Sequence, residues 1–140
     1  MSKVAIVFWS ATGNTEMMAN CIAEGAGAAG SILSCAEMTP EKLAEFDVVA
    51  FGCPAMGAEQ LEEGEFEPMF AALEGALSGK KIALFGSYGW GDGQWMRDWV
   101  ERAQGNGAVL FSAEGLMCNE TPDDDAQAAC RKLGAELAVW

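Results

Sequence analysis

The stretch VAIVFWSATGNT, residues 4–15, decides how the rest of this chain is organised. Its first half predicts a strand buried on both faces, because the apolar residues follow one another without alternation. Its second half is rich in hydroxyl groups and leads directly into a helical pattern. The order strand, turn, helix is typical of a phosphate site, in which free backbone N–H groups at the start of a helix bind the anion.

The turn at residues 10–15 would bind a phosphate without a positive side chain. No Lys or Arg lies between Lys3 and Lys42, so hydroxyl groups and the helix dipole would do the binding. This excludes the usual nucleoside-triphosphate loop, whose Lys reaches the terminal phosphates, and fits a monophosphate ester that stays bound. The alternative is an ordinary helix N-cap at Thr12 or Asn14.

The composition is that of an acidic globular protein. The chain has 140 residues, of which 51% are hydrophobic and 21% charged, and this predicts one domain with its own core. The net charge of −13 excludes nucleic acid as a partner, because binding to phosphates requires Lys and Arg. It favours a partner with a basic surface that is steered electrostatically. The alternative is that the acidity serves solubility alone.

Other classes of protein are excluded by what the sequence does not contain. No apolar run approaches the length of a membrane span and the N-terminus has no signal-peptide layout, so we expect a cytoplasmic protein with no membrane partner. The five cysteines are widely spaced and there is no histidine. This pattern argues against a zinc site, an iron–sulfur cluster or a dithiol redox motif, so we expect no metal and mostly structural thiols.

Strand and helix patterns alternate along the chain. Strands are expected at residues 4–8, 32–33, 48–51, 82–85 and 109–111, and helices from about 14 to a stop at Gly30, at 40–44, 66–77 and 95–103, and after 123–125. The alternation with short connections predicts an α/β fold, a doubly wound five-stranded parallel sheet with helices on both faces. Ligands of such sheets bind at the carboxyl ends of the strands.

Two further loops at this edge suit a flat aromatic ligand. They are residues 54–59, after the third expected strand, and residues 86–93, after the fourth. Trp90, between glycines, is a candidate stacking platform, Met56 offers a soft apolar face, and Glu59 can accept a hydrogen bond from a ring imide. The alternatives are core packing for Trp90, gap filling for Met56 and a solvated acidic run for Glu59. The next two tryptophans, at helical spacing, are expected in the core.

Together the three loops resemble those of the flavodoxins, and the chain is similar to short-chain, clostridial-like members of that FMN-binding family over nearly its whole length. Residues 10–15 resemble the phosphate loop, residues 53–59 the first flavin loop and residues 85–93 the second. The resemblance implies the strand order 2-1-3-4-5, a single flavodoxin-like FMN-binding domain over residues 1–140, and FMN as a non-covalent cofactor.

The resemblance also implies the site. The phosphate loop and Ser87 would surround the FMN phosphate, Trp90 and Met56 would cover the two faces of the ring, and Glu59 would accept from N3–H. Backbone N–H groups of the second loop would face the N1/O2 edge, and residues 118–120 would complete the rim of the pyrimidine. The full predicted FMN-binding set is Ser10, Ala11, Thr12, Gly13, Asn14, Thr15, Pro54, Ala55, Met56, Gly57, Ala58, Glu59, Ser87, Tyr88, Gly89, Trp90, Gly91, Cys118, Asn119 and Glu120.

The function implied is that of a low-potential one-electron carrier. It would shuttle FMN between semiquinone and hydroquinone, with no substrate of its own and no catalytic residues. In the family the peptide after Gly57 turns over on reduction, so that its carbonyl accepts the flavin N5–H. Two departures from the family pattern, Ala11 and Pro54, lie near the phosphate. A third, Ala58, is expected to need a positive φ, at a cost of about 1 kcal/mol relative to Gly.

Acidic residues flank both flavin loops, and the expected partners are larger redox enzymes with basic docking surfaces, approached by a monomer. These residues are Glu59, Glu62, Glu63, Glu65, Glu67 and Asp92. The alternative function is a flavodoxin-like NAD(P)H–quinone reductase, which would need room for a hydride donor over the ring. A receiver-type signalling domain would need acidic residues after the first and third strands, where Ser10-Ala11 and Cys53-Pro54 stand instead.

Overall fold

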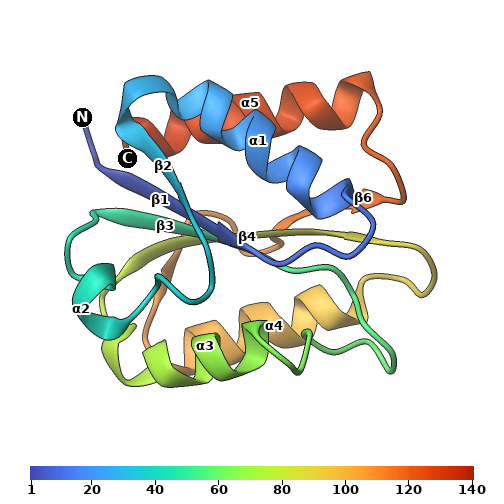
Figure 1. Ribbon diagram of the computed structural model, residues 1–140, viewed down its shortest axis with the longest axis horizontal. Coiled ribbons are helices and arrows are strands. Elements are labelled where there is room, and N and C mark those ends of the chain that lie inside the picture. The colour runs from blue at the N-terminus through green and yellow to red at the C-terminus, as the bar shows by residue number, and fades with distance from the viewer.

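A computed structural model describes residues 1–140 and shows a parallel sheet between two layers of helices (Figure 1). The strands are β1 Val4–Phe8, β2 Gly30–Leu33, β3 Val48–Gly52, β4 Lys81–Tyr88, β5 Val109–Leu110 and β6 Leu116–Asn119. The helices are α1 Asn14–Ala26, α2 Pro40–Leu43, α3 Phe66–Leu73, α4 Gln94–Gly105 and α5 Asp124–Ala138, with 3₁₀ turns at Gly27–Ala29 and Glu74–Ala76. The strand order is β2-β1-β3-β4-β5, with β6 also paired to β4. The predicted fold class and strand order are therefore confirmed.

The fifth strand is divided into two, so that the sheet has six strands instead of the five expected. Pairing with β4 stops at Ile82↔Leu110 and resumes at Phe85↔Leu116. The polar, glycine-containing residues 112–115 leave the sheet in between, and Gly115 turns the chain back with a φ of +70°. As a consequence Cys118 and Asn119, expected in a loop after the fifth strand, lie within β6.

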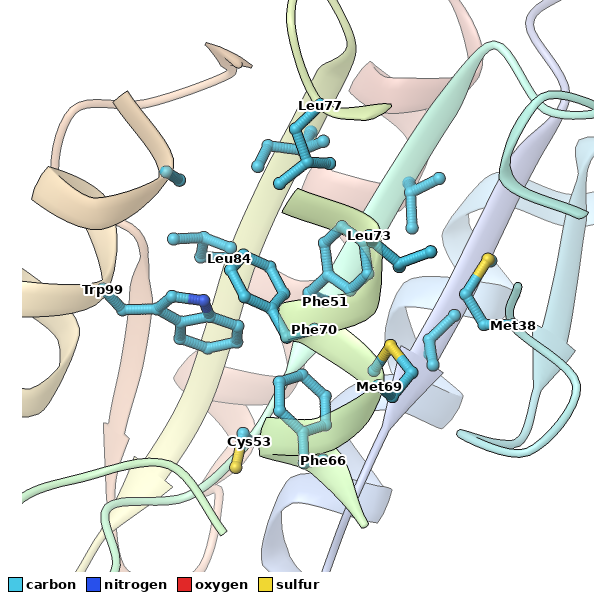
Figure 2. Close-up of a cluster of buried hydrophobic side chains, with 14 of the residues drawn as sticks. Met38, Phe51, Cys53, Phe66, Met69, Phe70, Leu73, Leu77, Leu84 and Trp99 are labelled. Atoms are coloured by element: carbon cyan, nitrogen blue, oxygen red, sulfur yellow. The ribbon is translucent and has the colours of Figure 1, made fainter. Parts of the chain in front are cut away.

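The core consists of two apolar layers, one on each face of the sheet. Helices α1 and α5 lie side by side over one face, and α2, α3 and α4 cover the other (Figure 1). The second layer is rich in aromatic rings (Figure 2); Phe66 and Phe70 each meet Trp99 edge to face, at centroid distances of 5.5 and 5.7 Å. Trp95 and Trp99 are only 2% exposed, which confirms that both belong to the core. The buried indole N–H of Trp99 has no hydrogen-bond partner.

Helices α1 and α5 approach one another unusually closely because each has a glycine at the contact. A Cβ at Gly25 would overlap the backbone of α5, and a Cβ at Gly134 would overlap the backbone of α1. The expected end of the first helix at Gly30 is wrong. The helix ends at Ala26, and Gly27, with a φ of +60°, begins a 3₁₀ turn that leads into β2 at Gly30.

The start of α5 agrees with the acidic pattern, since Asp123 is its N-cap and accepts a hydrogen bond from the Ala126 N–H at 2.8 Å. The third expected helix is shorter than the pattern indicates, because α3 ends at Leu73 and continues only as a 3₁₀ turn. None of the helices is both long enough and apolar enough to cross a bilayer. No group of three or more Cys, Asp or Glu side chains could hold a metal ion.

Candidate flavin site

The phosphate loop leads into helix α1 through a left-handed glycine, and a serine of the loop bonds to the first turn of the helix. Gly13 is the N-cap, with a φ of +93° and no side-chain cap, so neither Thr12 nor Asn14 caps the helix as the alternative required. The Asn14 N–H lies at the long distance of 3.5 Å from the Thr12 Oγ1. Ser10 Oγ accepts from the N–H groups of Gly13 and Glu16, at 3.1 and 3.2 Å. The backbone of the loop is thus folded around the Ser10 and Thr12 side chains. It lies at the N-terminus of α1, where backbone N–H groups suit an anion.

A buried pair of hydroxyl groups joins this loop to the neighbouring strand β4. Thr15 Oγ1 and Ser87 Oγ form a hydrogen bond of 3.0 Å, in which either can donate, and the Ser87 N–H donates to Thr15 Oγ1 at 3.4 Å. Thr15 is 1% and Ser87 4% exposed, and they are the only two buried residues of polar type in the chain. Because the two hydroxyl groups bond to each other, they are buried without the cost of unpaired polar groups, and both residues line the cavity between the loops.

The first flavin loop, residues 53–59, ends in a tight hairpin of residues 56–60. Two backbone hydrogen bonds between Met56 and Gln60, at 2.9 and 3.0 Å, close it. Gly57 takes part in neither bond, has a φ of +44°, and has open space where a Cβ would lie. The expected strain at Ala58 is wrong, because the non-glycine residue with positive φ in this loop is Glu59, at +55°. That left-handed conformation costs Glu59 about 1 kcal/mol.

The second flavin loop lies directly against this hairpin. The Glu59 carboxylate occupies the space beside the Gly91 Cα, and the φ of +86° at Gly91 is a left-handed conformation that favours glycine. Trp90 is 65% exposed, so the core-packing alternative for it is wrong. The exposed indole stays available as the stacking platform expected from the sequence.

A cavity of about 400 Å³ lies between these loops at the carboxyl end of the sheet. It is lined by Ser10, Ala11, Thr12, Asn14, Thr15, Pro54, Ala55, Met56, Ser87, Tyr88, Gly89, Glu120 and Thr121. All of these except Thr121 were named from the sequence. Thr121 directly follows Glu120, which was named, and its hydroxyl group is the feature of the sequence that would have identified it as a site residue. Ala11 has no positive φ, so its replacement of the usual glycine is unstrained.

The other predicted site residues lie at or beyond the borders of this cavity. Gly13 caps the helix behind the phosphate loop, and Gly57, Ala58 and Glu59 form the tip of the hairpin. The rest are Trp90 and Gly91 in the second flavin loop and Cys118 and Asn119 in β6. Burial, and to a lesser extent the charge of Asp123, raises the pKa of the Cys118 thiol, so that thiol stays protonated at neutral pH.

The residues present fit a phosphate ester attached to a flat ring. Its lining includes the hydroxyl groups of Ser10, Thr12, Thr15 and Ser87 as well as the side chains of Met56 and Tyr88. No Lys or Arg lines it, so the donors for a phosphate are neutral: hydroxyl groups, the Asn14 side-chain amide and backbone N–H groups. This donor set matches the one expected from the sequence.

The acidic run beside the hairpin has a structural role that the sequence pattern did not show. The Glu62 carboxylate accepts from the N–H groups of Gly64, Glu65 and Phe66 at 2.6 to 2.9 Å, and so caps the start of α3. Burial raises the pKa of Glu62, but these three donors outweigh it and hold the pKa below its usual value. The Glu62 N–H also lies 3.4 Å from Cys53 Sγ, and burial raises the pKa of that thiol to about 12.

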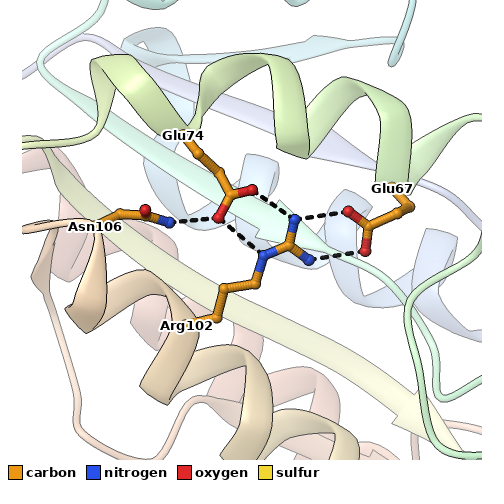
Figure 3. A network of polar contacts seen from close by, with 4 residues as sticks. All are labelled: Glu67, Glu74, Arg102 and Asn106. Carbon is orange, nitrogen blue, oxygen red and sulfur yellow. Dashed lines mark hydrogen bonds and ion pairs between the residues drawn. The ribbon is translucent and has the colours of Figure 1, made fainter.

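Two more residues of this run are bonded within the protein. Trp9 Nε1–H donates to Glu65 at 2.9 Å. Arg102 lies between Glu67 and Glu74 and donates two hydrogen bonds to each carboxylate, at 2.6 to 2.9 Å (Figure 3). Much of the acidic run therefore holds α3 to its neighbours.

The strand order, the three loops at one edge of the sheet and the cation-free phosphate turn define a flavodoxin-like flavin-binding protein. The sequence model of the flavodoxin family matches residues 6–134, and the chain belongs to this family.

The comparisons with individual relatives agree over nearly the full length. The flavodoxin of Clostridium beijerinckii is 45% identical over 136 residues, which cover 95% of this chain and 97% of that one. The flavodoxin of Megasphaera elsdenii is 44% identical over 138 residues, 96% and 98% of the two chains. The solution structure of two-electron reduced Megasphaera elsdenii flavodoxin superposes with a TM-score of 0.85 at 42% identity, over 98% of this chain and 99% of that one. The chain is therefore an FMN-binding electron carrier and not an enzyme, which excludes the quinone reductase alternative.

Proposed function

We propose that this chain is a low-potential one-electron carrier whose FMN shuttles between the semiquinone and the hydroquinone, passing electrons between larger redox enzymes. It acts as a monomer in the cytoplasm, with residues 1–140 as one FMN-binding domain. The observation that supports this best is the hairpin of residues 56–60, in which the Gly57 peptide belongs to neither of the closing hydrogen bonds. With no Cβ and open space around it, Gly57 can present its carbonyl toward the ring or away from it.

The binding residues proposed are those predicted from the sequence, with Thr121 added. The hydroxyl groups of the phosphate loop and Ser87 hold the phosphate, and the backbone N–H groups of Gly89 and Gly91 face the N1/O2 edge. Trp90 and Met56 cover the ring, and residues 118–120 border its pyrimidine end. Glu59 accepts from N3–H, a role for which its carboxylate is available because it belongs to no ion pair.

The charges around the cavity support a low potential. No cation lines the site, so the phosphate keeps its charge, and Glu59 and Glu120 add two carboxylates near the ring. A negative charge added in partly dry surroundings is disfavoured by its negative neighbours. The protein therefore resists the second electron more than the first, which separates the two steps.

Anaerobic reductive titration of the purified holoprotein, followed by visible absorbance, tests the proposal. We expect stoichiometric FMN, a blue neutral intermediate, and a smaller yield of it in Gly57→Ala than in the control Gly75→Ala, whose Cβ also meets open space. Bleaching in a single two-electron step would refute the one-electron cycle. A protein that takes up no FMN would refute the site.

The partner chemistry has a separate test. Reduction of the holoprotein by a reductase with a basic surface should slow as ionic strength rises, since salt screens the attraction between oppositely charged surfaces. A rate constant that does not change between low and high salt would refute docking on a basic surface while leaving the flavin site intact.

A further inference from the structure

A second cavity, of about 180 Å³, lies behind the hairpin of residues 56–60, between it and helices α3 and α4. We call it the rear pocket. Its apolar lining comes from Leu61, Trp95 and Trp99, and its charged lining comes from Glu59, Glu67, Asp98 and Arg102. A cavity of this volume is suited to one side chain and is less than half the size of the flavin cavity.

The rear pocket is negatively charged although an arginine lines it. Arg102 directs its guanidinium to Glu67 and Glu74, with two hydrogen bonds to each (Figure 3). These bonds use four of its five N–H groups, and Glu59, Glu67 and Asp98 together outnumber the one positive charge in the lining. Asp98 accepts only a neutral hydrogen bond, from Gln94 Nε2 at 2.8 Å, and neither Asp98 nor Glu59 belongs to an ion pair.

We propose that the rear pocket takes the side chain of a lysine on the redox partner. Its ammonium group would lie between the Glu59 and Asp98 carboxylates, and its four-carbon stem would pack on the apolar lining. Lysine buries its stem against apolar surface while its charged end stays with polar groups, and an ammonium is attracted to an indole face. The net charge of −13 supplies the long-range attraction that brings such a residue to this surface.

The position of the rear pocket explains why a partner would use it. The hairpin is a wall shared by the two cavities, since Met56 lines the flavin cavity and Glu59 lines the rear pocket. A lysine in the rear pocket would thus lie one hairpin away from the flavin cavity and hold its protein beside it. This inference rests on the proposed function, because it assumes a redox partner with a basic surface.

The test uses the FMN-loaded protein and Nα-acetyl-lysine amide as the probe. Titration at constant ionic strength should give saturable shifts of the indole N–H resonances of Trp95 and Trp99. The matched neutral probe, Nα,Nε-diacetyl-lysine amide, should give none. Asp98→Asn should weaken binding of the charged probe about threefold, the size expected for an exposed ion pair. Glu101→Gln removes the same charge from an exposed site on α4 outside the pocket and should leave the affinity unchanged.

Equal shifts with both probes, or equal weakening by the two variants, would overturn the inference. The reductive titration of the same samples separates this failure from failure of the proposed function. If wild type forms the blue intermediate but the charged probe behaves like the neutral one, the rear pocket has no role in docking and the carrier function stands. If no blue intermediate forms, the carrier function fails whatever the probes do.

Discussion

Arg102 should contribute more to stability than any other charged side chain of α4, and Arg102→Met tests this directly. Methionine keeps an apolar stem near Phe70, above whose ring the guanidinium carbon lies at 5.0 Å. The substitution therefore removes the charge and four hydrogen bonds while much of the packing remains. It leaves the carboxylates of Glu67 and Glu74 facing the vacated position (Figure 3).

The expected loss follows from geometry and exposure. A hydrogen bond to a charged group contributes about 1.5 to 3 kcal/mol when buried, whereas an exposed ion pair contributes about 0 to 1 kcal/mol. The side chains of Arg102, Glu67 and Glu74 are 30%, 37% and 27% exposed, between these limits. We expect a loss of about 2 kcal/mol in the free energy of unfolding, and a decrease in Tm of about 6 °C for a chain of this length.

Arg97→Met is the matched control on the same helix. Arg97 pairs with Asp92 at 3.0 Å, but the two side chains are 51% and 81% exposed, so the loss should be about 0.5 kcal/mol or less. Urea denaturation of the FMN-loaded proteins, at one FMN concentration, measures both values. Equal losses for the two variants would refute the reasoning.

The same network predicts a dependence on pH. Hydrogen bonds from Arg102, the largest cause, hold the pKa of Glu74 below its usual value. A carboxylate with a lowered pKa stabilises the fold above its unfolded pKa of about 4.3 and loses that contribution as pH falls through its folded pKa. The difference in stability between wild type and Arg102→Met should therefore be constant from pH 7 to about 5 and shrink below pH 4. A difference that persists undiminished at pH 3 would show that it comes from packing instead of charge.

Three further outcomes are expected. Glu62→Ala should destabilise by about 1 kcal/mol, the usual value of a helix cap, while Glu63→Ala, at the exposed neighbouring position, should change the urea midpoint little. Gly134→Ala should destabilise by about 1 to 3 kcal/mol, because its Cβ would overlap the backbone of α1; Gly105→Ala, which meets open space, should be neutral or stabilising in thermal unfolding. Burial, with added repulsion from acidic neighbours, raises the pKa of Cys35 to about 11, so its alkylation at pH 8 should be far slower in the native protein than in urea, and an equal rate would contradict the structure.

The fold and most of the site were accessible from local patterns. Continuous apolar runs at residues 4–8 and 48–51 predict strands buried on both faces, and both form the centre of the sheet with every residue from Val48 to Gly52 buried. The loop that follows each strand can be identified from the order of the residues. Parallel strands have their carboxyl ends at one edge of the sheet, so these loops lie close together. Hence twelve residues chosen as ligands from sequence line one cavity.

Contacts between distant segments were not accessible in this way. The division of the fifth strand depends on where residues 112–115 meet β4 and Met96, and the positive φ at Glu59 instead of Ala58 depends on the pairing of Met56 with Gln60. A periodicity reports which face of an element is apolar, but it contains no information on the neighbour that each residue meets.

The sequence by itself determined the α/β class and a phosphate turn without cations, because each depends on residues close together in the chain, while the strand order followed from the family resemblance alone. Only the tertiary structure decided what the acidic residues do. Glu62 caps α3, and Glu67 accepts hydrogen bonds from Arg102, which lies 35 residues further along the chain. The carboxylate of Glu59 contacts Gly91 in the neighbouring loop. A carboxylate looks the same in a sequence whether it is solvated or bonded, because its partner is set by the packing of whole elements and not by its neighbours in the chain.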